Sequence, residues 1–470
     1  MLPVVALVGR PNVGKSTLFN RLTGTKDALV ADFPGLTRDR LYGFARLDTE
    51  SGSMSEADPR SAIIIDTGGL TVDQGDLSSQ TNRQVDLAVS EAHAVILMVD
   101  GDAGCTAGDQ DVSNLIRQAG KPVLLAVNKT EGRPAEEVVG EFFELGLGDP
   151  VAISAKRGDR VNAMLDQALA LCPIDDADTS LAPEAEGTRI TVVGRPNVGK
   201  STLINRMLGE ERLVTLDTAG TTRDSIAIPF AVDERPFILV DTAGIRRRAR
   251  VQGMIEKFSV VKALQALEEA DAVIVLIDAQ EGVTEQDVSL IGLILERGRA
   301  LTLGVNKWDG LSGRQRTDLR KALDRKIPFL DFVEIHFVSA LHGTNIFDLL
   351  TSAAKAADAA ERNLDTPRLN EILREATGAH PPPVVGRHRV KLSYAHQGGK
   401  RPPVIVIHGN QTSRLPGSYR RYLVKRFRRA FRLKGTPIRL ELRTGSNPYE
   451  GRRNRLTPRQ FRRRKRIRGR

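Results

Sequence analysis

The amino-acid sequence predicts an α/β protein with two doubly wound, mostly parallel sheets, followed by a smaller α/β domain. Three observations support this fold class. The peptide GRPNVGKST occurs twice, at Gly9–Thr17 and at Gly194–Thr202, 185 residues apart. After each copy, short apolar segments alternate with amphipathic helical segments, which is typical of repeated βα units. Runs such as AVILMVD and AVIVLID lack alternation, as expected for parallel strands buried on both faces.

The predicted strands of the two copies follow one another in the same order. For the first copy we expect strands at Val4–Val8, Ala62–Asp66, Ala94–Asp100, Val123–Asn128 and Val151–Ser154. For the second copy we expect them at Ile190–Val193, Phe237–Asp241, Ala272–Asp278, Leu301–Asn306 and Phe332–Ser339. Functional groups in such sheets lie beyond the carboxyl ends of the strands, so the residues there are the first candidates for a site.

Composition divides the 470-residue chain into five parts. The two repeats occupy residues 1–172 and 189–360. The segment 173–188 between them is acidic, contains proline and has no apolar period, so it is expected to be a flexible linker. A third domain follows at 361–446. The Arg-rich tail, 447–470, also lacks an apolar period, and we expect it to be disordered until it meets a polyanion.

The third domain is expected to fold as helix, strand, strand, helix, strand. Its predicted helices are Pro367–Thr377 and Ser418–Leu433, and its predicted strands are Arg389–Tyr394, Val404–His408 and Ile438–Arg443. In the second helix an apolar residue recurs every fourth position, which predicts a stripe that faces the core: Tyr419, Leu423, Phe427 and Phe431. Basic residues surround this stripe, so the opposite side of the helix is expected to be cationic.

Charge is distributed very unevenly along the chain. From His380 to Arg470 there are 27 Lys and Arg against 2 Asp and Glu, a net charge of +25, whereas residues 1–379 carry 42 against 56, or −14. Such a basic block is the electrostatic signature of a nucleic-acid binder, and we favour nucleic acid over an anionic membrane as its partner.

Several classes of protein are excluded by composition. No stretch approaches the roughly 20 apolar residues needed to span a bilayer. The apolar start, Leu2 to Val8, runs directly into the first repeated motif, so we do not expect it to act as a signal peptide. Two cysteines, Cys105 and Cys172, cannot build a disulfide framework. We therefore expect a cytoplasmic protein without a membrane span.

The repeated motif has the pattern of a P-loop, GxxxxGKS. Its glycines allow the backbone to approach phosphates closely, and its amides and the following helix N-terminus attract the anion. Lys15 and Lys200 are expected to reach the β- and γ-phosphates, and Ser16 and Ser201 to bind Mg²⁺. The predicted phosphate-binding residues are Gly9, Arg10, Pro11, Asn12, Val13, Gly14, Lys15, Ser16 and Thr17, with Gly194, Arg195, Pro196, Asn197, Val198, Gly199, Lys200, Ser201 and Thr202.

Two further motifs complete a phosphate and magnesium site in each copy. The sequences DTGG and DTAG end predicted strands, and their aspartates, Asp66 and Asp241, are expected to hold Mg²⁺ through water. Thr37 and Thr222 are candidates to complete the Mg²⁺ shell; the alternative is that each is only a turn residue. Gly69 and Gly244 leave room for a backbone N–H to the γ-phosphate. The nucleotide-binding residues expected from these motifs also include Thr67 and Gly68, with Thr242 and Ala243. Lys15, Thr37, Lys200 and Thr222 are the candidate catalytic residues.

Guanine selection is predicted by the NKxD pattern. A carboxylate accepts hydrogen bonds from the N1–H and the exocyclic amine of guanine, whereas adenine has an acceptor and no amine at those positions. In the second copy Asn306 would brace the loop, Lys307 would lie over the base and Asp309 would bind it. The first copy departs from the pattern because Glu131 follows Asn128 and Lys129. Backbone amides at Ser154–Ala155 and Ser339–Ala340 are expected near the guanine O6.

One expected catalytic group is missing from both copies. Many GTPases orient the attacking water with a Gln just after the DxxG motif, but Leu70 and Ile245 occupy those positions here. Hydrolysis would then need a group supplied from elsewhere or a compensating cation. Asn12 and Asn197 offer a carbonyl oxygen for such an ion; alternatively, they only satisfy the local backbone.

Taken together, these motifs resemble the Der (EngA) family of bacterial tandem GTPases. The resemblance rests on two GRPNVGKS modules, DTGG then DTAG, NKWD and the basic C-terminal domain, and it covers essentially the whole chain. It implies two P-loop GTPase domains, a KH-like third domain, association with the large ribosomal subunit and a role in its maturation. It also implies potassium-stimulated hydrolysis through Asn12 and Asn197. The third domain lacks a GxxG between helices, so RNA clamping in the usual KH manner is not supported.

From these motifs and from what the resemblance implies, we expect a GTP-hydrolysing switch that binds GTP, GDP and ribosomal RNA and is monomeric off the ribosome. Its expected cofactors are Mg²⁺ and K⁺. The alternative is an RNA-binding scaffold in which GTP is mainly a structural ligand. The missing Gln favours the scaffold, while two intact sets of Mg²⁺ motifs favour the switch.

Overall fold

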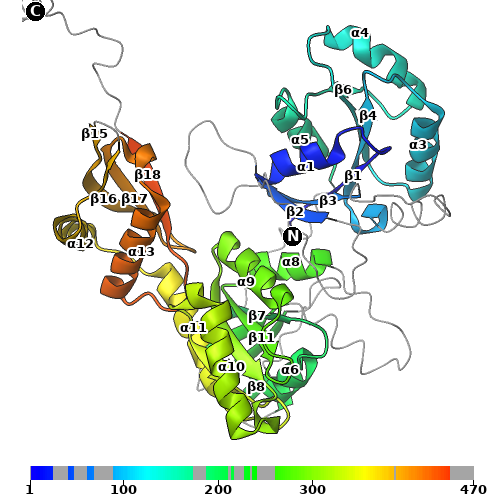
Figure 1. Cartoon of the computed structure of the whole chain (residues 1–470). Coiled ribbons are helices and arrows are strands. Elements are labelled where there is room, and N and C mark those ends of the chain that lie inside the picture. Colours follow the sequence, from blue (N-terminus) through cyan, green and yellow to red (C-terminus); the bar gives the residue numbers. More distant parts are fainter. Residues whose placement is uncertain are drawn as a thin grey trace, which may run out of the picture. The chain divides into compact units, whose positions relative to one another are not determined.

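The computed structural model describes residues 2–24, 41–46, 61–67, 88–172, 187–209, 213–215, 227–232, 235–240, 260–385 and 388–444 (Figure 1). The chain forms two compact units. The first comprises Met1–Arg362, Gly399–Pro403 and Leu433–Pro437, and the second comprises Asn363–Gly398, Val404–Arg432 and Ile438–Arg470. Within the described residues, no helix is long and apolar enough to cross a membrane.

The first repeat folds around a six-stranded sheet. Its strands are β1 (Val4–Val8), β2 (Leu41–Arg46), β3 (Ser61–Asp66), β4 (Ala94–Asp100), β5 (Val123–Asn128) and β6 (Val151–Ala152), in the order β2-β3-β1-β4-β5-β6. Every neighbouring pair is parallel except β2 and β3. The five predicted strands are present, and they contribute the parallel part of the sheet.

Helices cover both faces of this first sheet. On one face, α1 (Lys15–Thr23) and α5 (Val161–Ala170) bury apolar residues in one cluster with Val5 and Leu7 of β1. On the other, α3 (Ala107–Ala119), α4 (Ala135–Val139) and η1 (Gly140–Leu145) share a cluster with Val4 and Ala6. Successive residues of β1 therefore face opposite layers, and the predicted doubly wound fold is confirmed.

The second repeat folds around a seven-stranded sheet. Its strands are β7 (Thr188–Gly194), β8 (Leu213–Thr215), β9 (Ile228–Val232), β10 (Arg235–Leu239), β11 (Ala272–Asp278), β12 (Ala300–Asn306) and β13 (Ile335–Phe337), in the order β13-β12-β11-β7-β10-β9-β8. The strands from β13 to β10 are parallel, whereas β9 and β8 are antiparallel additions to the predicted strands. Thr188, which composition assigned to the linker, is the first residue of β7.

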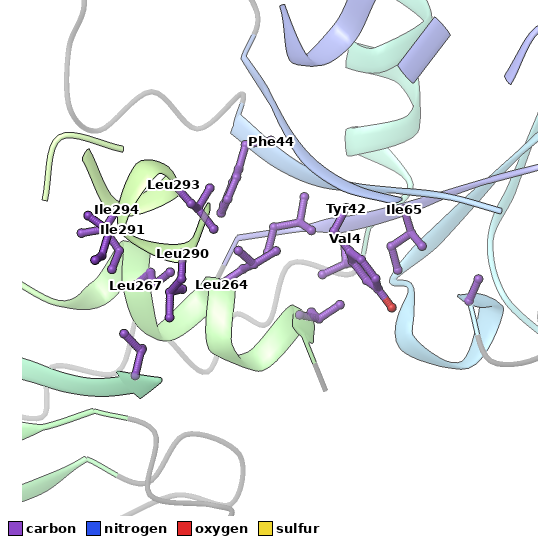
Figure 2. Close-up of a cluster of buried hydrophobic side chains, with 14 of the residues drawn as sticks. Val4, Tyr42, Phe44, Ile65, Leu264, Leu267, Leu290, Ile291, Leu293 and Ile294 are labelled. Atoms are coloured by element: carbon purple, nitrogen blue, oxygen red, sulfur yellow. The ribbon is translucent and has the colours of Figure 1, made fainter. Parts of the chain in front are cut away.

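Two helical layers also enclose the second sheet. The helices are α6 (Lys200–Gly209), α8 (Val260–Glu269), α9 (Glu285–Arg297), α10 (Gly313–Lys326) and α11 (Ile346–Glu361), with the short turns η3 (Trp308–Gly310) and η4 (Pro328–Leu330). Apolar residues of α6 and α11 form one cluster with β11. The cluster on the other face includes residues of α8 and α9, which gather in Figure 2: Leu264, Leu267, Leu290, Ile291 and Ile294.

The third domain contains a three-stranded sheet in the order β16-β17-β18, beside which α12 and α13 contact each other. Its elements are α12 (Thr366–Ala379), β14 (Val384–Val385), β15 (His388–Arg389), β16 (Lys391–Gly399), β17 (Val404–Asn410), η5 (Thr412–Arg414), α13 (Gly417–Phe431) and β18 (Arg439–Thr444). The first predicted strand was wrong in extent, because β16 continues to Gly399 while β15 pairs separately with β14. The predicted stripe on α13 is buried at Tyr419, Leu423 and Phe427. The predicted tail, 447–470, lies outside the described residues.

Candidate nucleotide-binding sites

The phosphate loop of the first module joins β1 to α1 and depends on glycine at both of its ends. Gly9 has φ +152° and Gly14 has φ +104°, values that residues with a side chain rarely adopt. A Cβ atom on Gly9 would lie 2.3 Å from the carbonyl oxygen of Met98. In the second module Gly194 and Gly199 have nearly the same angles, +151° and +100°. The backbone of both loops therefore requires glycine at these positions.

The P-loop lysines lie across their own loops. Lys15 is only 6% exposed, and its ammonium donates to the carbonyl oxygens of Gly9 and Arg10, both at 2.7 Å. Burial lowers the pKa of Lys15, and the nearby carboxylate of Asp66 partly offsets this effect. Lys200 makes the equivalent bonds to the carbonyl oxygens of Gly194 and Arg195, both at 2.8 Å. Each ammonium is thus held at the phosphate loop, where the sequence places it.

The asparagine of the first guanine motif connects three separate motifs. The Asn128 side-chain amide donates to the carbonyl oxygen of Val13 at 2.8 Å, and its carbonyl oxygen accepts from the amide of Ala155 at 2.9 Å. A Cβ atom on Gly14 would lie 2.3 Å from Asn128 Nδ2, so glycine is also required for this contact. Asn128 therefore holds the phosphate loop and the Ser154–Ala155 loop together.

The second module repeats this connection. Asn306 donates to the carbonyl oxygen of Val198 at 2.7 Å and accepts from the amide of Ala340 at 2.9 Å, and Gly199 again leaves room for it. The sequence predicted that Asn306 would brace its loop, and the structure shows that the brace extends to the phosphate loop.

The two guanine-motif carboxylates are held by equivalent serines. The Ser154 hydroxyl donates to Glu131 Oε1 at 2.5 Å, and this bond is the main reason why the pKa of Glu131 is lowered. A hydrogen bond from Ser339 is likewise the main cause of the lowered pKa of Asp309. Both carboxylates are therefore kept in the charged form that accepts the guanine donors. Glutamate reaches the serine of its module despite its additional methylene.

Replacing Glu131 by aspartate should tighten GTP binding by the first module about 5- to 30-fold. The additional carbon–carbon bond of glutamate displaces the carboxylate by about 1.5 Å. Imperfect alignment of charge-assisted bonds, each worth roughly 1.5–3 kcal/mol, would forfeit about 1–2 kcal/mol. Nucleotide titration of the wild-type chain and Glu131→Asp measures the difference, with the second module as the internal reference. Unchanged affinity would mean that the loop accommodates the methylene.

Sequence reasoning missed the partners of the guanine-motif lysines. Lys129 Nζ lies 2.5 Å from Asp100 Oδ2, and Lys307 Nζ lies 2.5 Å from Asp278 Oδ2. These aspartates end β4 and β11, which were recognised only as strands. Burial alone would raise the pKa of Asp100, but hydrogen bonds from Lys129 and from the Asp102 amide lower it. The Asp that ends both apolar runs was the available signal.

A second missed pair anchors each phosphate loop. Arg10 Nε donates to Asp109 Oδ1 at 2.8 Å, and Arg195 Nε donates to Asp287 Oδ1 at 3.0 Å. Both aspartates are fully buried and also accept from the threonine that caps the start of their own helix. The T-x-x-D spacing at Thr106 and Thr284 could have revealed the caps but not their arginine partners.

The described residues include part of the predicted magnesium site. Ser16 lies in the first turn of α1, and Asp66 is fully buried at the end of β3, in register with Leu7 of β1. Their oxygens are the hard ligands that Mg²⁺ prefers, so these residues fit the ion. The Thr67 hydroxyl donates to the carbonyl oxygen of Leu7 at 2.9 Å and thus ties β3 to β1. The other predicted residues of this group lie outside the described residues: Thr37, Gly68, Gly69, Thr222, Asp241, Thr242, Ala243 and Gly244.

Family models and relatives of known name match nearly the entire chain. The family model for a 50S ribosome-binding GTPase matches residues 4–129 and 189–307, and the model for the C-terminal KH-domain-like region of EngA bacterial GTPase enzymes matches 363–443. A GTPase Der of Thioalkalivibrio sulfidiphilus is 53% identical over 467 residues, which cover 99% of this chain and 98% of that protein. A GTPase Der of Methylococcus capsulatus is 51% identical with the same coverage.

These similarities agree with the two complete sets of nucleotide-binding motifs and with the α/β architecture of all three domains. The expected pair of P-loop GTPase domains and the expected KH-like domain are confirmed. The chain belongs to the Der (EngA) family of tandem GTPases, proteins that bind and hydrolyse GTP.

Proposed function

We propose that this GTPase is a cytoplasmic switch in the assembly of the large ribosomal subunit. Each module binds Mg²⁺·GTP, and hydrolysis rearranges the loops that carry Thr37 and Thr222. This rearrangement changes how the basic C-terminal region is presented to ribosomal RNA. Off the ribosome the protein is a monomer.

One observation carries this proposal: two GTP sites precede a region of net charge +25 within one chain. Nucleotide sites provide two states, and a cationic region provides affinity for phosphates. The family model that matches both modules is that of a 50S ribosome-binding GTPase, which supports the large subunit as the partner.

Nucleotide-dependent ribosome association tests the switch. Purified ribosomal subunits would be sedimented with the full-length protein in the presence of a non-hydrolysable GTP analogue, GDP or no nucleotide. We expect association with the large subunit to differ between the analogue and GDP. A ligand that binds two states equally shifts neither, so equal association in all three conditions would favour the scaffold with structural GTP.

The basic tail should contribute to RNA affinity. Deleting residues 447–470 removes 11 Lys and Arg. Binding to ribosomal RNA should weaken, and the slope of log affinity against log salt should become shallower, because each phosphate contact contributes about 0.7–0.9 to that slope. GTP turnover off the ribosome should stay unchanged and serves as the control. An unaltered salt slope would show that the tail does not touch phosphates.

The residues that would hold Mg²⁺ are Ser16, Asp66 and Thr37 in the first module and Ser201, Asp241 and Thr222 in the second. When bound, Mg²⁺ neutralises charge on the β- and γ-phosphates. The chain contributes the P-loop amides and the ammonium groups of Lys15 and Lys200, which bind and orient the phosphates. Because Leu70 and Ile245 cannot orient water, a monovalent cation is proposed to compensate charge instead.

Asn12 and Asn197 are the proposed potassium ligands. Both adopt the left-handed conformation, with φ +67° and +62°, and both side chains are exposed at the phosphate loop. Hydrolysis should be faster in potassium than in sodium at equal ionic strength. Asn197→Ala should remove this difference for the second module while GTP still binds, and Asn12→Ala should do the same for the first. Equal rates in both salts would leave the asparagines with a local structural role.

A further inference from the structure

The sheet of the KH-like domain has two faces of different character. Ala395, Ile405 and Ile407 are fully buried, and the Asn370 side chain of α12 bonds to the backbone nitrogen and oxygen of Ala395 at 2.9 and 2.8 Å. Because side chains alternate along a strand, their neighbours Tyr394, His396 and His408 lie on the other face. None of these three rings is fully buried.

These three rings, here named the ring cluster, form one contiguous surface. The centroid of His396 lies 5.7 Å from that of Tyr394 and 5.2 Å from that of His408, with interplanar angles of 27° and 21°. Tyr394 and His408 are 6.1 Å apart and tilted. Tyr394 is 45% exposed, so a large part of its ring is open to solvent. The ring of His396 therefore lies nearly parallel to each of its two neighbours, one on its own strand and one on the adjacent strand.

The neighbouring residues give this face an apolar floor and a cationic edge. A Cβ atom on Gly398 would lie 2.5 Å from Val406 Cγ2, and Val406 is 1% exposed, so the two strands are in close contact here. Arg443 of β18 is in register with His408, and its side chain is 51% exposed. It also makes an ion pair with Glu441 at 3.2 Å, which neutralises part of its charge, while about half of the side chain stays exposed to solvent.

The electrostatics of the ring cluster suit a neutral aromatic ligand beside an anion. Burial, with the nearby charges of His408 and Arg443, lowers the pKa of His396 and favours its uncharged ring. The KH-like domain and the basic tail together carry a large positive charge, which would attract a polyanion. An apolar protein partner would not require this charge, whereas a nucleic-acid strand presents both flat bases and phosphates.

We propose that the ring cluster is a stacking platform for unpaired bases of RNA, with Arg443 beside the phosphates. Aromatic and histidine rings on an open sheet face stack bases of any sequence, which duplex RNA does not expose. This inference rests on the proposed RNA partner and names the part of the domain that contacts unpaired nucleotides. The ring cluster would provide the contact to RNA that a GxxG clamp, which the sequence lacks, makes in other KH domains.

A fluorescent single strand tests the platform directly. The probe is an oligouridylate of about ten nucleotides that carries one 2-aminopurine, whose fluorescence is quenched when it stacks. The full-length protein should quench the probe. Tyr394→Ala and His408→Ala should each weaken binding about 5-fold or more, since one base–ring contact accounts for about 5- to 150-fold. Tyr394→Phe keeps the ring and should bind as the wild type does.

Controls separate stacking from charge and from folding. The alanine variants should keep the salt slope of the wild type, whereas Arg421→Ala, on the exposed part of α13, should make it shallower without affecting quenching. Duplex RNA of the same length should bind all Tyr394 variants equally. Circular dichroism melting checks the fold, and His408→Phe provides a second variant that retains a ring.

Two results would overturn the platform. The first is that the wild-type protein binds the probe without quenching its fluorescence. The second is that quenching persists in the Tyr394→Ala, His408→Ala double variant, which would mean that another segment stacks on the base. Failure of the proposed ribosomal function is distinguishable from both. In that case the probe would still be quenched through the ring cluster while sedimentation with ribosomal subunits was absent.

Discussion

Asp309→Asn should weaken GTP binding by the second module about 150-fold. The carboxylate accepts from two guanine donors, and charge-assisted bonds are worth roughly 1.5–3 kcal/mol each. An amide keeps one acceptor but turns an NH₂ donor toward a guanine donor. A loss of about 3 kcal/mol corresponds to the stated factor. Titration calorimetry of the full-length chain resolves the two sites, and Glu131→Gln is the matched change in the first module.

Two further measurements identify the carboxylate as the cause. Xanthosine triphosphate has a carbonyl where guanine has its amine, so Asp309→Asn should bind it more tightly than the wild type does. The pKa of Asp309 is lowered, chiefly by the hydrogen bond from Ser339, so its charged form persists as pH falls. Affinity should therefore stay constant down to about pH 4, near the ordinary aspartate value, and decline only below it. A decline beginning near pH 6 would contradict this assignment.

Asp287→Ala should destabilise the second module by about 3–5 kcal/mol, the usual cost of removing one partner from a buried ion pair. Asp287 is fully buried, and the Arg195 side chain that it binds is only 12% exposed. The substitution also removes two hydrogen bonds to Thr284, at the start of α9. Because the carbonyl oxygen of Arg195 accepts from Lys200, GTP affinity should fall as well.

The single tryptophan of the chain makes this measurement specific. Trp308 lies in the second module, with its ring centroid 4.1 Å from that of Phe337, so its fluorescence during urea unfolding reports on this module. Glu281→Ala removes the solvent-exposed partner of Arg195 and should cost less than about 1 kcal/mol. Asp109→Ala, the equivalent change in the first module, should leave the Trp308 transition unchanged. If the Asp287→Ala variant unfolded at the same urea concentration as the wild type, the anchoring role of Asp287 would be refuted.

The phosphate and guanine motifs were predictable because their chemistry depends on local spacing. A P-loop places its glycines and lysine within one short segment, so Gly9, Gly14 and Lys15 identify it from sequence. Buried parallel strands leave continuous apolar runs, and for this reason the strands Ala94–Asp100 and Ala272–Asp278 were predicted to the residue. The antiparallel strands β8 and β9 were not, because Leu213–Thr215, at the edge of the sheet, is short and Ile228–Val232 contains Pro229.

Two GTP sites and a basic third domain could be predicted from the residues of this chain alone. The side chains that hold those sites in shape could be identified only in the folded molecule. Arg10 and Asp109 are 99 residues apart, and Asn128 and Val13 are 115 apart, so no local pattern links them. The ring cluster likewise arises only when β16 and β17 pair, because strand register decides which side chains share a face.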